Sequence, residues 1–114
     1  MIDLQKILEI EPTLTPNGIE SSSCDEQFDA DDIKQIETCI GWLKTKKIQD
    51  KIAGVSTSYG IKHIIEREMD TYVSNGCFIA AVIHLGIPYK RINVPNIQVA
   101  ISETELHKND PNRG

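Results

Sequence analysis

Four polar side chains that could do chemistry lie close together near the middle of this 114-residue chain: Tyr59, Lys62, His63 and Glu66. On a helix, positions i, i+4 and i+7 share one face, so Tyr59, His63 and Glu66 would point the same way. A histidine titrates near neutral pH and a carboxylate can orient it, as in general acid–base catalysis. No nucleophile or phosphate-binding loop accompanies the pair. Ordinary surface packing and a partner-binding patch both fit these residues, and a small hydrolase centred on His63 is a distant alternative.

The cysteines and histidines give no metal or disulfide pattern. The three cysteines are odd in number, widely spaced and without a C-x-x-C pair, which argues against a disulfide framework and against zinc. They are Cys24, Cys39 and Cys77. His63, Glu66 and His84 lack a ligand spacing such as H-E-x-x-H. We therefore expect reduced thiols in a cytoplasmic protein, with no metal and no cofactor.

Two predicted helices on either side of a short turn are the second feature of the sequence that could carry function. Residues 58–70 and 74–86 each carry helical apolar spacing, and a connection of about three to four residues resembles a helix-turn-helix. In DNA-binding versions the second helix reads the major groove with polar side chains. Here the second helix is apolar nearly all round, from Phe78 to Leu85, so we expect a buried helical hairpin. The alternative is a DNA-binding transcriptional regulator that uses Asn75, His84, Lys90 and Arg91.

The charges are distributed unevenly along the chain. The formal charge is −5, and the acids concentrate in the first forty residues. This balance argues against a strong, nonspecific grip on nucleic acid by the whole chain, because phosphate binding needs a concentrated positive face. A run of carboxylates can occupy a basic groove on a partner. We therefore expect Asp29, Asp31 and Asp32 to act as accessory partner contacts.

The apolar pattern predicts three main helices. Ile33, Ile36, Ile40 and Leu43 recur at steps of three and four, which indicates a helix over about residues 30–47, begun by Asp29 or Asp31. The helices over 58–70 and 74–86 follow, each with a capping Ser, Thr or Asn. A stop at Gly54 would end any continuation of the first helix.

A change of period near the C-terminus predicts β structure. Ile97, Val99 and Ile101 alternate with other residues at period two, which is typical of a half-buried strand. An antiparallel hairpin around Pro95-Asn96, with Ile92 and Val94 in its first strand, would extend it.

These elements predict a single, mainly α domain over residues 29–104, with a helix-turn-helix-like hairpin and a short C-terminal strand or hairpin. An acidic, partly flexible arm (residues 1–28) would precede it, and a frayed tail (105–114) would follow. No run of 18 apolar residues occurs, so we expect no membrane partner. The N-terminus lacks the basic start of a secretory signal.

Residues 58–102 are similar to small uncharacterised proteins carried by bacterial phages, plasmids and other mobile elements. The resemblance is carried by Ser58-Tyr59-Gly60, Lys62-His63, Tyr72, Asn75-Gly76 and Phe78-Ile79-Ala80-Ala81. It implies an origin in a mobile element more than a mechanism, and small proteins of such elements often regulate transcription or block host defence by binding a host protein. We therefore expect a non-enzymatic protein that binds a host protein or nucleoprotein complex. We expect an inhibitor of a bacterial defence complex, similar to anti-CRISPR proteins, and a homodimer is a further expectation.

Overall fold

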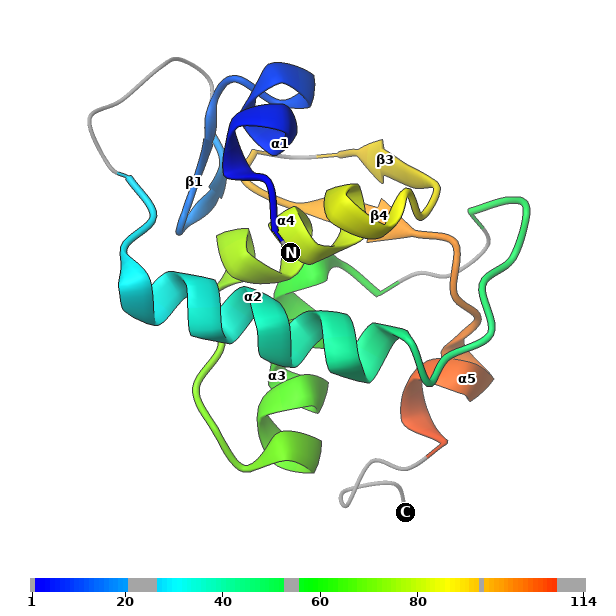
Figure 1. The fold of residues 1–114 in the computed structure, drawn as a ribbon. Coiled ribbons are helices and arrows are strands. Elements are labelled where there is room, and N and C mark those ends of the chain that lie inside the picture. Colours follow the sequence, from blue (N-terminus) through cyan, green and yellow to red (C-terminus); the bar gives the residue numbers. More distant parts are fainter. Residues whose placement is uncertain (1, 21–26, 53–55, 93, 109–114) are drawn as a thin grey trace.

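The computed structural model describes residues 2–20, 27–52, 56–92 and 94–108 (Figure 1). The acidic run around Asp25, the proposed stop at Gly54 and the tail beyond residue 108 lie outside the described residues. Within them the chain forms five helices and two small antiparallel sheets. In order these are α1 (Leu4–Ile10), β1 (Leu14–Thr15), β2 (Gly18–Ile19), α2 (Ala30–Leu43), α3 (Ser58–Met69), α4 (Asn75–Leu85), β3 (Tyr89–Arg91), β4 (Ile97–Val99) and α5 (Glu103–His107).

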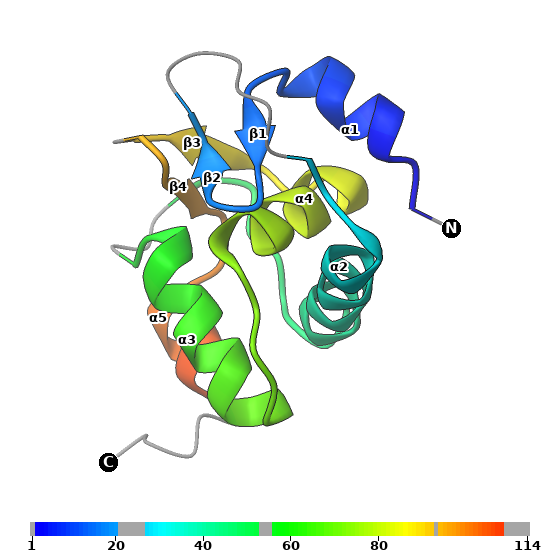
Figure 2. The same cartoon turned by 90° about the vertical axis from the view of Figure 1, so that its left-hand side faces the viewer.

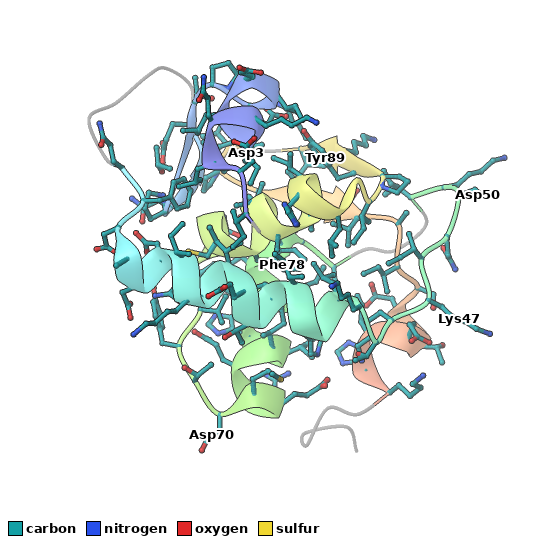
Figure 3. All side chains as sticks on the ribbon, in the orientation of Figure 1. Asp3, Lys47, Asp50, Asp70, Phe78 and Tyr89 are labelled. Atoms are coloured by element: carbon teal, nitrogen blue, oxygen red, sulfur yellow. The ribbon has the colours of Figure 1, made fainter. Side chains whose placement is uncertain are left out.

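Helix α4 is the centre of the molecule. It packs most extensively against α2 and also contacts α1, α3 and the β1–β2 ribbon, which surround it in Figures 1 and 2. Every residue from Asn75 to Ile83 is buried, and Phe78 lies in the middle of the molecule (Figure 3). Ser74 caps the helix by accepting the Cys77 N–H at 3.2 Å, and Gly86, at φ +70°, ends it. The predicted burial of this helix is confirmed.

The β1–β2 turn comes unusually close to the first turn of α4. The Gly76 N–H donates to the Pro16 carbonyl at 2.9 Å. A Cβ on Gly76 would lie 1.8 Å from the Thr15 carbonyl oxygen, far inside van der Waals contact. Only glycine therefore allows this approach, which holds the N-terminal ribbon against the central helix.

The N-terminal residues contribute to the core instead of standing apart from it. Ile7, Leu14 and Ile19 are all nearly fully buried. Glu11, itself buried, accepts a hydrogen bond from the Tyr89 hydroxyl at 2.5 Å. Burial, together with this hydrogen bond to a carboxylate, raises the pKa of Tyr89. These contacts tie α1 and the following ribbon to β3.

The mainly α character is confirmed in its coarse form, but the expected count of elements was too low. We expected about three helices and one hairpin, whereas α1, α5 and the β1–β2 ribbon add two helices and a second sheet. The extra elements are very short, and such segments have no long periodic pattern in the sequence. Leu106 of α5 is buried, so this short helix too contributes to the core.

Helix α2 begins where predicted and ends earlier. Asp29 accepts the Asp32 N–H, and the Asp32 side chain accepts the Asp29 N–H, which forms a capping box. The helix ends at Leu43, not near residue 47. Beyond it, the Lys46 side chain turns inward and lies over the Trp42 ring, 4.7 Å from its centroid. The lysines after Leu43 therefore do not extend the helix.

The structure contains the predicted C-terminal hairpin, but its first strand is formed by other residues than predicted. β4 lies where the period-two pattern placed it, and it pairs with β3 in the register Tyr89↔Val99, Lys90↔Gln98 and Arg91↔Ile97. The first strand therefore lies before Ile92 and Val94, which instead belong to the connection.

Among the described residues, no helix is both long enough and apolar enough to cross a bilayer.

Candidate partner-binding face

The outer side of α3 brings together Tyr59, His63 and Glu66. Thr57 caps this helix by accepting the Gly60 N–H. One turn along, the rings of Tyr59 and His63 meet edge to face with centroids 4.7 Å apart. The His63 Nδ1 lies 2.9 Å from Glu66 Oε1, so the carboxylate fixes the orientation of the imidazole. The predicted helical spacing therefore does place these three side chains on one face.

Lys62 differs from the surface cation that we expected. Its residue is only 6% exposed, because the ammonium points inward and donates to the Val73 carbonyl at 3.0 Å and to Glu66 Oε2 at 3.2 Å. The same ammonium lies 5.5 Å from the centroid of the Tyr59 ring and 4.9 Å from that of Tyr72. The buried Lys62 ammonium therefore makes cation–π contacts with both exposed rings, those of Tyr59 and Tyr72.

Glu66 connects α3 with the loop that leads to α4. Its carboxylate accepts the Val73 N–H at 3.1 Å as well as the Lys62 and His63 contacts. Partial burial raises the pKa of this carboxyl, but the hydrogen bonds from Val73, Lys62 and His63 outweigh it, so the pKa lies below its ordinary value. Glu66 is thus a charged anchor inside the face.

Tyr72 is a member of the face that the predicted set omitted. It lies in the α3–α4 connection and is 64% exposed, while Tyr59 is 55% exposed. The available signal was a tyrosine in a short polar connection, since tyrosine is enriched at protein interfaces. We call Tyr59, Lys62, His63, Glu66 and Tyr72 together the tyrosine face.

A groove of about 580 Å³ runs beside the tyrosine face. Four separate parts of the chain line it: the β1–β2 turn, the start of α3, the α3–α4 loop with the start of α4, and the β3–β4 connection. The lining residues are Pro16, Asn17, Tyr59, Lys62, Tyr72, Ser74, Asn75, Pro95 and Asn96. Lys62 is the one residue of this lining with a charged side chain, and Glu66 compensates it. The groove is therefore polar and aromatic, with little net charge.

Asn75 holds the walls of the groove together. Its side-chain amino group donates to the Asn17 carbonyl at 3.0 Å and to Asn96 Oδ1 at 3.1 Å. Its own Oδ1 is buried and has no hydrogen-bond partner among the described residues. Asn75 is 6% exposed, so it works inside the fold and not as a reader of base edges.

The four residues of the DNA-binding alternative do not form one surface. Asn75 is buried at the start of α4, and His84 is exposed at its other end. Lys90 and Arg91 are exposed on β3, where Arg91 Nη1 lies 3.6 Å from Glu11. Because α4 is covered along most of its length, it offers no polar face to a major groove, which weighs against this alternative.

The acidic residues that we predicted as partner contacts already accept hydrogen bonds within the protein at the start of α2. Asp29 and Asp32 cap the helix, and Asp31 accepts a hydrogen bond from the Gln35 side chain at 2.9 Å. Gln35 in turn accepts the Ser74 N–H at 2.9 Å, which connects this acidic end of α2 with the groove. The carboxylates therefore stabilise the helix, while Asp29 and Asp31 still face solvent.

The described residues were also predicted to hold no metal ion, and a second hollow lies away from the tyrosine face. Across them, no group of three or more His, Cys, Asp or Glu side chains is arranged to hold a metal ion. A second hollow, about 280 Å³, lies where α1 meets the end of α4 and is lined by Asp3, Lys6, Ile7, Ile10, Ile83 and His84.

Comparison with protein family models, with curated proteins and with solved structures found no match to this chain.

Proposed function

We propose that this chain is a non-enzymatic protein-binding module that acts by occupying the surface of a partner through the tyrosine face. The observation that carries this proposal is the pair of large exposed rings, Tyr59 and Tyr72, held on either side of the buried Lys62 ammonium. Tyrosine is enriched among the residues that supply most of the energy of protein interfaces. Exposed apolar surface that is rimmed by polar residues is typical of interaction sites.

The surroundings of the two rings favour binding because they reduce the conformational entropy that these side chains lose when a partner binds. Tyr59 contacts the His63 ring, and His63 is in turn held by Glu66. Glu66 and Lys62 together fix the loop that carries Tyr72. Side chains that are already ordered lose little freedom when a complex forms, so more of the contact energy becomes affinity.

The polar groups of the face already bond to one another and to the backbone, which also favours a binding role. Glu66 receives three contacts and Lys62 makes two, so neither is held ready for a substrate. From the sequence we expected residues 58–102 to resemble proteins of mobile elements, and the choice of a bacterial host partner depends on that expectation alone. We therefore propose a host protein or nucleoprotein complex, with a defence complex as the specific expectation.

The test is affinity capture with matched variants. Tagged wild type, Tyr59→Ala/Tyr72→Ala and Ile48→Ala would each be incubated with bacterial lysate, and captured proteins would be identified and then reconstituted with purified components. Ile48 is exposed but lies away from the groove lining, so its variant controls for general loss of apolar surface. We expect one stoichiometric partner that the double variant loses and the control retains. Equal capture by all three proteins would refute the role of the tyrosine face.

A further inference from the structure

The start of the central helix α4 has only half of a capping box within its own sequence. In a complete box, the N-cap side chain accepts the N–H of the third helical residue, whose side chain accepts the N-cap N–H in return. Ser74 accepts the Cys77 N–H at 3.2 Å. Cys77 has no side-chain oxygen to return the bond, and its thiol donates to the Asp32 carbonyl at 3.4 Å. Because Ser74 is only 8% exposed, its N–H needs an acceptor from elsewhere in the fold.

Gln35 of α2 supplies this acceptor. Its Oε1 accepts the Ser74 N–H at 2.9 Å, where the α3–α4 connection passes the first turns of α2 (Figure 1). Gln35 therefore takes the part that the third helical residue plays in an ordinary capping box, but from a different helix. The start of α4 consequently depends on a side chain of α2.

Asp31 determines which end of the Gln35 amide faces Ser74. A glutamine amide has an acceptor oxygen and a donor amino group, and it can present either one. Asp31 Oδ2 accepts the Gln35 amino group at 2.9 Å. Because a carboxylate only accepts, this contact turns the amino group toward Asp31 and leaves the oxygen for Ser74. Asp31, which we predicted as a partner contact, thus orients Gln35.

The peptide group that joins Val73 to Ser74 is held by two helices at once. Its carbonyl accepts the Lys62 ammonium of α3 at 3.0 Å, and its N–H donates to Gln35 of α2. The chain directly after Tyr72 therefore cannot rotate without breaking a bond to one helix or the other. Tyr72 itself is exposed, so its place on the surface is set by these neighbouring backbone contacts.

We propose that Gln35 is a positioning residue for the tyrosine face: by completing the cap of α4 from α2, it fixes the place of the Tyr72 ring. The inference rests on the proposed function, in which Tyr72 is an anchor for the partner. An anchor that is already ordered loses less entropy on binding, so Gln35 contributes to affinity through Tyr72 and not by a contact of its own. Glu66 holds the same loop from α3, so the loss of Gln35 loosens the loop and leaves the fold intact.

The test measures order in the α3–α4 connection by NMR, with no partner present. In Gln35→Leu, which has no acceptor, we expect the Ser74 amide to exchange with solvent about fivefold faster or more. The backbone order parameter of Tyr72 should fall from about 0.85 toward about 0.6, while that of Tyr59 should not change. Unchanged exchange at Ser74 with unchanged order at Tyr72 would overturn the proposal.

An exchange of polarity tests the contacts in sequence. In Asp31→Lys the new ammonium only donates, so the Gln35 amide must turn its amino group toward the Ser74 N–H, which is also a donor. We expect the same loss of order as in Gln35→Leu. Adding Gln35→Glu should restore it, because a carboxylate accepts from both neighbours. Glu37→Lys is the matched control, since it makes the same change of charge on α2 beside a different hollow, and Tyr72 should stay ordered. A double variant that remains as mobile as Asp31→Lys would contradict the proposal.

A binding measurement separates this inference from the proposed function. With the purified partner that the wild type captures, Gln35→Leu should bind about two- to tenfold more weakly. In a Tyr72→Ala background the same change should have no further effect, as expected for a residue that acts through Tyr72. An equal effect in both backgrounds would overturn the positioning role. If Tyr59→Ala/Tyr72→Ala leaves capture unchanged, the proposed function is wrong, whereas the NMR measurement still decides whether Gln35 holds the loop.

Discussion

The carboxylate of Glu66 accepts the backbone N–H of Val73 at 3.1 Å, so a side chain of α3 fixes the loop that leads into the central helix. Tyr72 is the residue just before Val73, and its exposed ring therefore depends on this contact for its position. The same carboxylate orients His63 and neutralises Lys62. One partly buried carboxylate thus holds the neighbours of both tyrosines of the face in position.

Replacing Glu66 with glutamine should lower stability in a pH-dependent way. At pH 7 we expect a loss of about 1–3 kcal/mol, since bonds to a charged group are weakened and Lys62 loses its counterion. The folded pKa of Glu66 lies below its ordinary value of 4.5. The stability that its charge contributes is therefore fully present above pH 4.5 and decreases as the pH falls through the lower, folded pKa.

Urea unfolding of wild type and Glu66→Gln at a series of pH values from 7 to 3 would measure this difference. The gap in the free energy of unfolding between the two proteins should be constant at neutral pH and should narrow in acid. A gap that does not change with pH would show that the carboxylate is not the source of the stabilisation.

Alanine at Gly76 should destabilise the protein although alanine favours helices. Its Cβ would meet the Thr15 carbonyl oxygen at 1.8 Å, so the β1–β2 turn must move. We expect a cost of about 1–3 kcal/mol or more, the scale of overpacking in a close-packed site. Gly41→Ala is the matched control, because the helical Gly41 has no neighbouring atom within 4 Å of such a Cβ. It should stabilise by up to about 1 kcal/mol.

Chemical denaturation of the two glycine variants would test both predictions together. Opposite signs of the change in unfolding free energy are expected. If both variants were stabilised, the close approach of the ribbon to α4 would be wrong.

Methionine at Lys46 should leave a buried carboxylate without its partner. The Lys46 side chain is 1% exposed, and its ammonium lies 3.9 Å from Glu68 Oε2, an oxygen that has no hydrogen bond in the described residues. Breaking one side of a buried ion pair costs about 3–5 kcal/mol. Adding Glu68→Gln removes the orphaned charge while it keeps an acceptor for the Trp42 indole, which now donates at 2.9 Å. The double variant should recover most of the loss in thermal unfolding experiments, and a purely additive double loss would contradict this pairing.

The thiols of Cys39 and Cys77 should be unreactive in the native protein. Both are buried, and burial is the main cause that raises the pKa of each thiol, to about 12 for Cys77. In a Cys24→Ser background, a disulfide reagent at pH 8 should label neither thiol until urea unfolds the protein. Rapid labelling of either one under native conditions would show that this part of the core opens readily.

Sequence patterns were most informative for the long, capped helices. Asp29, Thr57 and Ser74 each begin a helix at or next to the predicted position, and the apolar run from Phe78 is buried as expected. These features depend on local capping and on one-dimensional periodicity, which a single sequence contains. The strand at residues 97–99 was visible for the same reason.

The missing elements depend on contacts between distant residues. The β1–β2 ribbon has two residues per strand, and it forms against α4 because Gly76 admits the Pro16 carbonyl. Lys62 looked like a surface cation, but its acceptor is the Val73 carbonyl eleven positions away. No periodic pattern encodes either contact, so neither the full sheet content nor the inward lysine could be predicted.

The groove takes its walls from residues 16–17, 59–62, 72–75 and 95–96, which only the folded chain brings together. It is consequently a discontinuous epitope. Antibodies raised against linear peptides of this sequence should not block it, and a synthetic copy of α3 alone should not compete with the intact protein. Blocking reagents would have to be selected against the native fold.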